Sequence, residues 1–324
     1  MLIRIFRSAY MIKIMMFLAV SLLLWMPAFL NPPNPVTFST YGIAYDFLAG
    51  IFHHSDRIVV FIAFVVLLVQ AIIFNAVLVE NPFFSKSVFL PALIYVILMS
   101  HNPLHLTMHP LLLANFFLIF SLRNLLSTYE KQEAFKESFN ASFWVAIATL
   151  FYLPAIYLLL LIWMAFILFR ISSWREWLIS LIGFGIPLLI MAIVFYLTER
   201  FDSLLQYYPR DFSDFSTSLS MNLHDYIFWP AFVVLMGMAY LKFINELPDK
   251  IISMRKSFAV VNVFVLLSAA TVFFSGTNPH FHAYLIFPAA SVIVAYYFIE
   301  TKRIIIAELL FLLLLIAIAI NKFV

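Results

Sequence analysis

Long apolar runs separated by short polar segments are the dominant pattern along the chain. They predict membrane-spanning helices at residues 11–30, 58–79, 88–100, 110–127, 138–153, 155–170, 177–197, 224–244, 257–275, 283–299 and 303–321. None of these runs alternates apolar and polar residues as a membrane barrel strand does. The pattern therefore predicts an all-α, polytopic integral membrane protein with about eleven transmembrane helices, forming a single transmembrane domain over residues 1–324.

Composition supports a membrane protein and narrows its partners. Hydrophobic residues make up 65% of the 324 residues and charged residues 11%, whereas a soluble domain has about 45–50% and about 25%. The net charge is only +3, and the basic residues are scattered between the apolar runs. Basic residues between apolar runs set the orientation of a membrane protein. The expected partner is therefore the lipid bilayer, and the charges do not form a nucleic-acid surface. The chain has no cysteine, which excludes disulfides and cysteine metal sites.

Residues 138–170 are almost continuously apolar and are interrupted by Pro154. One helix over this stretch would be about 50 Å long at 1.5 Å per residue, against a bilayer core of about 30 Å. Two short helices with a reversal at Pro154 fit the bilayer. The reversal also sets the sidedness of every later loop.

With the reversal, most of the 19 Lys and Arg residues lie in the loops that share a side with the N-terminus. The positive-inside rule then predicts a bacterial inner (cytoplasmic) membrane protein with its N-terminus in the cytoplasm and its C-terminus outside. All eight histidines fall on the outer side. The alternative interpretation is that histidine simply collects at membrane interfaces.

The first outer loop, residues 31–57, contains the amphipathic segment "YGIAYDFLAGIF", which predicts a helix lying on the membrane surface. Asp46 and Asp56 are its acids. A carboxylate here is a candidate general base or metal ligand, with a solvated residue at headgroup level as the alternative. No cofactor is indicated with certainty, and a divalent metal is left open.

Two further outer segments carry candidate chemistry. In the long outer loop, residues 198–223, Arg200 and Arg210 are suited to holding a phosphate, and Tyr207 and Tyr208 to stacking on a sugar. An ordinary interfacial loop with internal ion pairs is the alternative. "SHNPLHLTMHP" spaces three histidines four residues apart, as on one helix face, although two prolines disfavour a regular helix there. The alternatives are a metal site and interfacial hydrogen bonding.

The segment "HFHAYLIFPAASVIVAYY" resembles an element of the GT-C type glycosyltransferases, which use polyprenyl-phosphate sugar donors. The paired short helices around Pro154, the stretch "WREWLISLIGFGIPLLIMAIVFYL" and the surface helix after the first span resemble further elements of that family. The resemblance implies substrate-binding roles for His280, His282 and Tyr284. The chain departs from the family at "FSTYG", where an acidic pair is usual. With "LNPP", "FYLP" and "WREW" it also resembles an uncharacterised family of polytopic proteins from Bacteroidota.

Three functions remain open on this basis. The first is a GT-C-like transferase acting on the outer face, with Asp46 as base or metal ligand, Arg200, Arg210 and His282 at the donor phosphate, and Tyr45, Tyr207 and Tyr208 at the acceptor. The second is a non-catalytic membrane subunit of a cell-envelope assembly, which would bind other envelope proteins through the same face. The third is a transporter of lipid or neutral solute.

Overall fold

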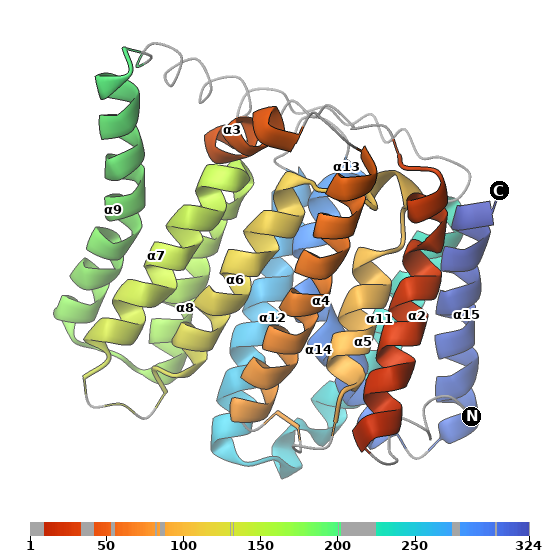
Figure 1. Ribbon diagram of the computed structural model, residues 1–324. Helices are drawn as coiled ribbons and strands as arrows, with labels where there is room; N and C mark the ends of the chain where they lie inside the picture. Colours follow the sequence, from red (N-terminus) through yellow and green to blue (C-terminus); the bar gives the residue numbers. More distant parts are fainter. Residues whose placement is uncertain are drawn as a thin grey trace.

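A computed structural model describes the chain at residues 10–33, 42–52, 56–81, 83–84, 88–129, 131, 133–199, 201, 225–273, 279–301 and 303–323. Within these ranges the structure is all-α (Figure 1). Its helices are α2 (Tyr10–Leu30), α3 (Ile43–Phe52), α4 (Asp56–Glu80), α5 (Leu90–Met99), α6 (Pro110–Leu126), α7 (Phe135–Phe151), α8 (Leu159–Phe169), α9 (Trp174–Leu197), α11 (Asp225–Glu246), α12 (Ile252–Phe273), α13 (Pro279–His282), α14 (Phe287–Glu300) and α15 (Ile304–Phe323).

Helix length and hydropathy identify a multi-pass membrane protein. Among the described residues, five segments are long and apolar enough to cross a bilayer: Lys13–Leu30, Asp56–Glu80, Trp174–Leu197, Tyr226–Asp249 and Ile252–Val272. Shorter apolar helices accompany them. Many large apolar side chains on these helices are exposed, as on α9 and α15, because the surrounding solvent is lipid rather than water.

The chain reverses at Pro154, as its length and charge predicted. Helix α7 ends at Phe151, a 3-10 turn covers Leu153–Leu158, and α8 begins at Leu159. Proline cannot continue the α7 hydrogen-bond ladder, since it lacks an N–H group. The end of α8 returns to the segment between α6 and α7, where the ring centroids of Phe169 and Tyr129 are 5.3 Å apart.

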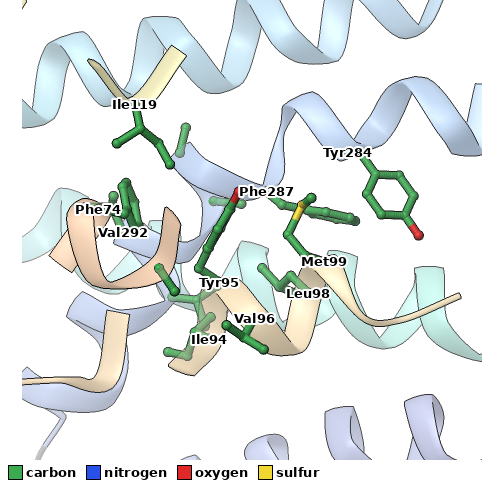
Figure 2. Packing of buried hydrophobic residues seen from close by; sticks show 14 of the residues in the cluster. Phe74, Ile94, Tyr95, Val96, Leu98, Met99, Ile119, Tyr284, Phe287 and Val292 are labelled. Carbon is green, nitrogen blue, oxygen red and sulfur yellow. The ribbon is translucent and has the colours of Figure 1, made fainter. Parts of the chain in front are cut away.

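Helices α5 and α14 form the centre of the protein. Every residue of α5 is buried, and α14 is buried from Phe287 to Phe298. Figure 2 shows their side chains interlocking, with Tyr95 of α5 beside Phe74 of α4. Two buried polar side chains here are paired: the Tyr95 hydroxyl donates to Gln70 Oε1 at 2.8 Å, and Gln70 Nε2 donates to the Leu112 carbonyl at 2.7 Å. Pairing of this kind is required where water is absent.

Helix α14 begins four residues later than the predicted span at 283–299. Residues Ala283–Leu285 form a 3-10 turn, and Pro288 occupies the first turn of α14. The first turn of a helix suits proline best, because the N–H group that proline lacks has no helical partner there. The irregular backbone before it therefore places His282 and Tyr284 at the end of the helix rather than within it.

Helix α3 lies across the ends of the upright helices, above α7 in the view of Figure 1. The Gly42 N–H donates to the Phe151 carbonyl at 2.9 Å and so fixes the start of α3 on the last turn of α7. Only glycine fits there, because a Cβ on residue 42 would lie 2.1 Å from the Leu150 carbonyl oxygen. A helix is thus present at the expected segment and is anchored to the Pro154 hairpin.

Candidate functional site: a lateral groove beside a histidine–tyrosine cluster

A groove of about 1410 Å³ opens between α3, the end of α7 and the C-terminal half of α9. Its walls are largely apolar and include Phe47, Phe151 and Ile190. Its polar residues are Asp46, Thr198 and Glu199, which lie where α3 and the end of α9 come together. A trough with one polar end is the shape that an amphipathic lipid requires.

Asp46 is the candidate carboxylate that the structure places in this groove. It is partly exposed on α3, in the first turn of the helix, where a negative charge is favourable. Asp56 is not among the residues that line the groove. It is exposed in the first turn of α4, where it has the same favourable position relative to the helix dipole.

Glu199 is a groove residue that the sequence analysis did not single out. It follows Thr198, the C-cap residue of α9, and has a φ of 57°, which is the left-handed region that favours glycine. A negative charge at a helix C-terminus is also electrostatically unfavourable. The signal was visible as an acid in "TER", directly after an apolar helix, where a basic residue or glycine is usual.

Tyr45 connects the groove to a second cluster of polar side chains. Its hydroxyl donates to the Met108 carbonyl at 2.8 Å. Met108 precedes His109 in the turn between α5 and α6, so α3 rests on the segment that carries the outer histidines. The polar cluster itself is formed by His101, His105, His109, Tyr152, His282 and Tyr284, all of them buried.

Two histidine–tyrosine pairs join distant parts of the chain in this cluster. The His105 Nδ1 and the Tyr284 hydroxyl are 3.0 Å apart, and His282 Nδ1 is hydrogen-bonded to the Tyr152 hydroxyl. Asn115 adds a third link, since its Nδ2 donates to the Tyr284 carbonyl at 3.0 Å. These bonds hold the turn before α14, the turn before α6 and the Pro154 hairpin together.

His109 is the N-cap of α6, and its tautomer follows from the contact. The Leu112 backbone N–H donates to His109 Nδ1 at 3.2 Å, so this nitrogen carries a lone pair and the ring proton is on Nε2. Burial, together with the nearby His105 and His101, lowers the pKa of His109 well below its ordinary value. The ring is therefore neutral in the folded protein at pH 7.

The three histidines of "SHNPLHLTMHP" do not share one helix face. The segment is a 3-10 turn over Pro103–His105 followed by an extended His109, because the two prolines break the helix as predicted. His101 stacks on Phe228, with ring centroids 4.3 Å apart. The Nδ1 atoms of all three lie within hydrogen-bonding distance of protein atoms.

The described residues contain no group of three or more His, Asp or Glu side chains arranged to hold a metal ion. Asp46 and Glu199 line one groove without a third such ligand beside them. The site as described does not fit a divalent metal, and the chemistry below involves none.

The remaining candidates are less fully placed. Arg200, Tyr207, Tyr208 and Arg210 lie outside the described residues. His280 belongs to α13, and the structure describes its backbone only. His282 and Tyr284 are fully buried and are not among the groove residues. The described part of the predicted site therefore divides into a groove with Asp46 on its α3 wall and a buried cluster, to which Tyr45 connects α3 through the Met108 carbonyl.

The fold and site define a multi-pass helical membrane protein with a groove between α3, the end of α7 and α9. The chain belongs to a family of unknown function, DUF6427, whose sequence model matches residues 35–324. Neither a curated protein nor a solved structure matches it.

Proposed function

We propose that the protein is a membrane-embedded GT-C-like transferase, which moves a sugar from a polyprenyl-phosphate donor on the outer face of a bacterial inner membrane. The observation that supports this most is the groove of about 1410 Å³ with Asp46 on its α3 wall. In this proposal the lipid chain lies along the apolar residues of α9 that line the groove, and the head of the lipid lies beside the Asp46 carboxylate. A surface helix fixed over a short-helix hairpin agrees with the resemblance to that family.

In the proposed reaction Asp46 is the general base. The acceptor hydroxyl oxygen forms a bond to the anomeric carbon of the sugar while its proton passes to the Asp46 carboxylate. The bond between that carbon and the phosphate oxygen breaks, and its electron pair leaves with the polyprenyl phosphate. Positioned proton transfer of this kind contributes about 10²- to 10⁴-fold in rate. Asp46 thus substitutes for the acidic pair that is missing at residues 38–42.

The histidine–tyrosine cluster has a positioning role in this proposal. Tyr45 is a direct neighbour of Asp46, and its hydroxyl is held by the turn that carries His105 and His109. The contacts of His282 with Tyr152 fix the hairpin that anchors Gly42. The donor phosphate is assigned to Arg200 and Arg210, with Tyr207 and Tyr208 near the sugar.

The test is replacement of Asp46 by asparagine, which keeps the size of the side chain and removes the base. We expect at least a hundredfold loss of sugar transfer at an unchanged protein level, measured by mass spectrometry of envelope glycans in cells that carry the variant alone. Asp249→Asn, an exposed acid at the opposite end of the helices, is the matched control and should leave the glycans unchanged. A normal glycan profile in Asp46→Asn cells contradicts the proposal.

The non-catalytic envelope subunit is the second candidate, and the absence of an acid from "FSTYG" favours it. In that case the exposed apolar face of α9 would bind a transmembrane helix of another envelope protein. Co-purification in mild detergent distinguishes the two, because a subunit should retain its partner in the Asp46→Asn variant as in the wild type. A lipid or solute transporter needs a cavity that reaches both faces of the membrane. The described residues that line the groove come from α3, the end of α7 and the C-terminal half of α9.

A further inference from the structure

The N-cap of α6 depends on a nitrogen of His109 that carries no proton. The Leu112 backbone N–H donates to His109 Nδ1 at 3.2 Å, and a proton on Nδ1 would turn this acceptor into a second donor. The carbonyl of the same Leu112 accepts from Gln70 Nε2 at 2.7 Å. Protonation of His109 therefore breaks the bond between the turn and α6, whereas α6 stays fixed to α4.

The surroundings of His109 disfavour a positive charge. The residue is 4% exposed, and the ring centroids of Phe281 and Tyr284 lie 5.5 and 5.2 Å from its own. The neighbouring imidazole of His105 is 6.1 Å away. Burial and the charges of His105 and His101 all lower the pKa of His109. An imidazolium at this place would have to reach water to be solvated.

The elements packed around the turn carry other titratable side chains within their described residues. These are Tyr45 and Asp46 on α3, Asp56 and Arg57 on α4, Tyr152 after α7, and His282 and Tyr284 before α14. Asp56 and Arg57 are exposed, and Tyr152 is bonded to His282. The charged groups that act on the pKa of His109 are the imidazoles of His105 and His101, so no carboxylate there offsets the effect of burial.

The turn that ends at His109 also holds α3. Met108 directly precedes His109, and its carbonyl accepts from the Tyr45 hydroxyl at 2.8 Å. The turn lies at the surface, where Leu104 is 47% exposed, so it can open at a lower cost than the buried helices α5 and α14. Movement of the turn toward water would solvate the imidazolium and withdraw the Met108 carbonyl from Tyr45.

We propose that His109 makes the docking of α3 sensitive to pH: protonation of the imidazole opens the turn between α5 and α6 and releases Tyr45 of α3 from it. In the proposed orientation the signal is acidification of the compartment outside the inner membrane. The groove would keep its α3 wall at neutral pH and lose it in acid. The proposal concerns the position of α3, so it goes beyond the transfer reaction and does not require it.

The direction of the effect follows from the two states of the imidazole. In the open turn His109 faces water and has the ordinary pKa of about 6.5, whereas in the docked form its pKa is lowered. Docking is therefore favoured above about pH 6.5. Below that pH the ratio of released to docked α3 should rise by up to about tenfold per pH unit, because one proton is bound on release.

The absence of cysteine allows spin labels to be placed in pairs on the full-length protein. A pair at Phe47 on α3 and Leu178 near the start of α9 reports the position of α3, and a pair at Leu104 and Leu178 reports the turn. Leu178 with Leu309 of α15 is the control pair. All four positions are exposed. Pulsed electron paramagnetic resonance measures the distances in phosphatidylcholine vesicles, whose headgroup does not titrate between pH 7.5 and 5.

At pH 7.5 we expect one distance for each pair. As the pH falls to 5, a second population should appear and grow in the Phe47 and Leu104 pairs, while the control pair stays unchanged. A single distance for the Phe47 pair at pH 5, or an equal change in the control pair, overturns the proposal.

Three variants assign the response to its parts. His109→Asn and His109→Ser keep a good N-cap and do not titrate in this range, so both should retain the pH 7.5 distances at pH 5. Tyr45→Phe removes the bond to the Met108 carbonyl, so the Leu104 pair should still respond to pH while the Phe47 pair no longer follows it. A response that survives in both His109 variants overturns the assignment to His109. An unaltered Phe47 response in Tyr45→Phe overturns the link through Met108.

The distances are measured without a sugar donor, so this proposal and the proposed function fail separately. Distances that do not depend on pH, with glycans that depend on Asp46, would contradict the pH response and leave the transferase in place. A pH-dependent position of α3 with normal glycans in Asp46→Asn cells would have the reverse meaning.

Discussion

The Tyr284 hydroxyl lies 3.0 Å from Nδ1 of His105, although 179 residues separate them in the sequence. Both side chains are buried, at 0% and 8% exposure, so neither can exchange this bond for one to water. The pair ties the turn before α14 to the turn before α6, beneath the segment that supports α3.

Tyr284→Phe should therefore destabilise the protein by about 1–3 kcal/mol, the cost of leaving a buried polar atom without its partner. Thermal unfolding in detergent, followed by tryptophan fluorescence, measures the change. Tyr196→Phe is the control, because Tyr196 is 72% exposed on α9, and its effect should stay within about 0.5 kcal/mol. Equal unfolding midpoints for the two variants would contradict a stabilising role for the pair.

Gly42→Ala should displace α3 from the hairpin. The new Cβ would lie 2.1 Å from the Leu150 carbonyl oxygen, and backbone atoms cannot move away as a flexible side chain can. We expect a loss of stability of about 1–3 kcal/mol and a loss of sugar transfer, because Asp46 is carried by α3. Gly237→Ala, in the middle of α11 with no atom within 4 Å of the new Cβ, should be neutral or stabilising by up to about 1 kcal/mol.

The contact between α7 and α9 depends on a second glycine. A Cβ on Gly183 would lie 2.5 Å from Ser142 Oγ and 2.6 Å from the Phe139 carbonyl oxygen, whereas a Cβ on Gly185 would meet nothing within 4 Å. Gly183→Ala should therefore separate the helices that carry two walls of the groove and lower the thermal unfolding midpoint in detergent. Gly185→Ala, two positions along the same helix, should leave the midpoint unchanged or raise it, and an equal loss in both variants would contradict the close contact at Gly183.

His109 should make stability depend on pH. Its pKa is lowered in the folded protein, so below about pH 6.5 the unfolded chain binds a proton that the folded ring does not. Stability attributable to His109 is thus present at neutral pH and is lost as the pH falls, by up to about 1.4 kcal/mol per pH unit.

His109→Asn isolates this contribution, because asparagine is also a good N-cap and does not titrate. Unfolding midpoints measured between pH 7.5 and 5 should fall less steeply in the variant than in the wild type. Parallel pH profiles would mean that His109 is protonated in both states or in neither.

The helices could be predicted from sequence because each is an apolar run whose ends are marked by proline or charge. Pro154 and the distribution of Lys and Arg were enough to predict the hairpin, and the prolines at 103 and 110 to predict the broken helix between them. The amphipathic pattern of "YGIAYDFLAGIF" likewise predicted α3. These are local properties, and lipid leaves the backbone few alternatives to helix.

The arrangement of the site could not be obtained in the same way. Whether Asp46 or Asp56 reaches a groove depends on how α3 packs on α7, and that is decided by the close approach at Gly42. The partner of His282 is Tyr152, 130 positions away, and no pattern within either segment indicates the other. The four-residue spacing of the histidines is compatible with one helix face, but Pro103 and Pro110 prevent a regular helix in this segment.

Helices α5 and α14 contain 10 and 14 residues, which is about 15 and 21 Å of helix against a hydrocarbon thickness of about 30 Å. Since protein surrounds them on all sides, they pay no penalty for failing to match the membrane. In the proposed outer-face orientation, their shortness would place the imidazole and phenol groups at their ends below the level of the surrounding headgroups. A substrate head that descends beside α3 would thus meet fixed protein dipoles at a depth where bulk water is scarce, and its tail would never have to leave the bilayer.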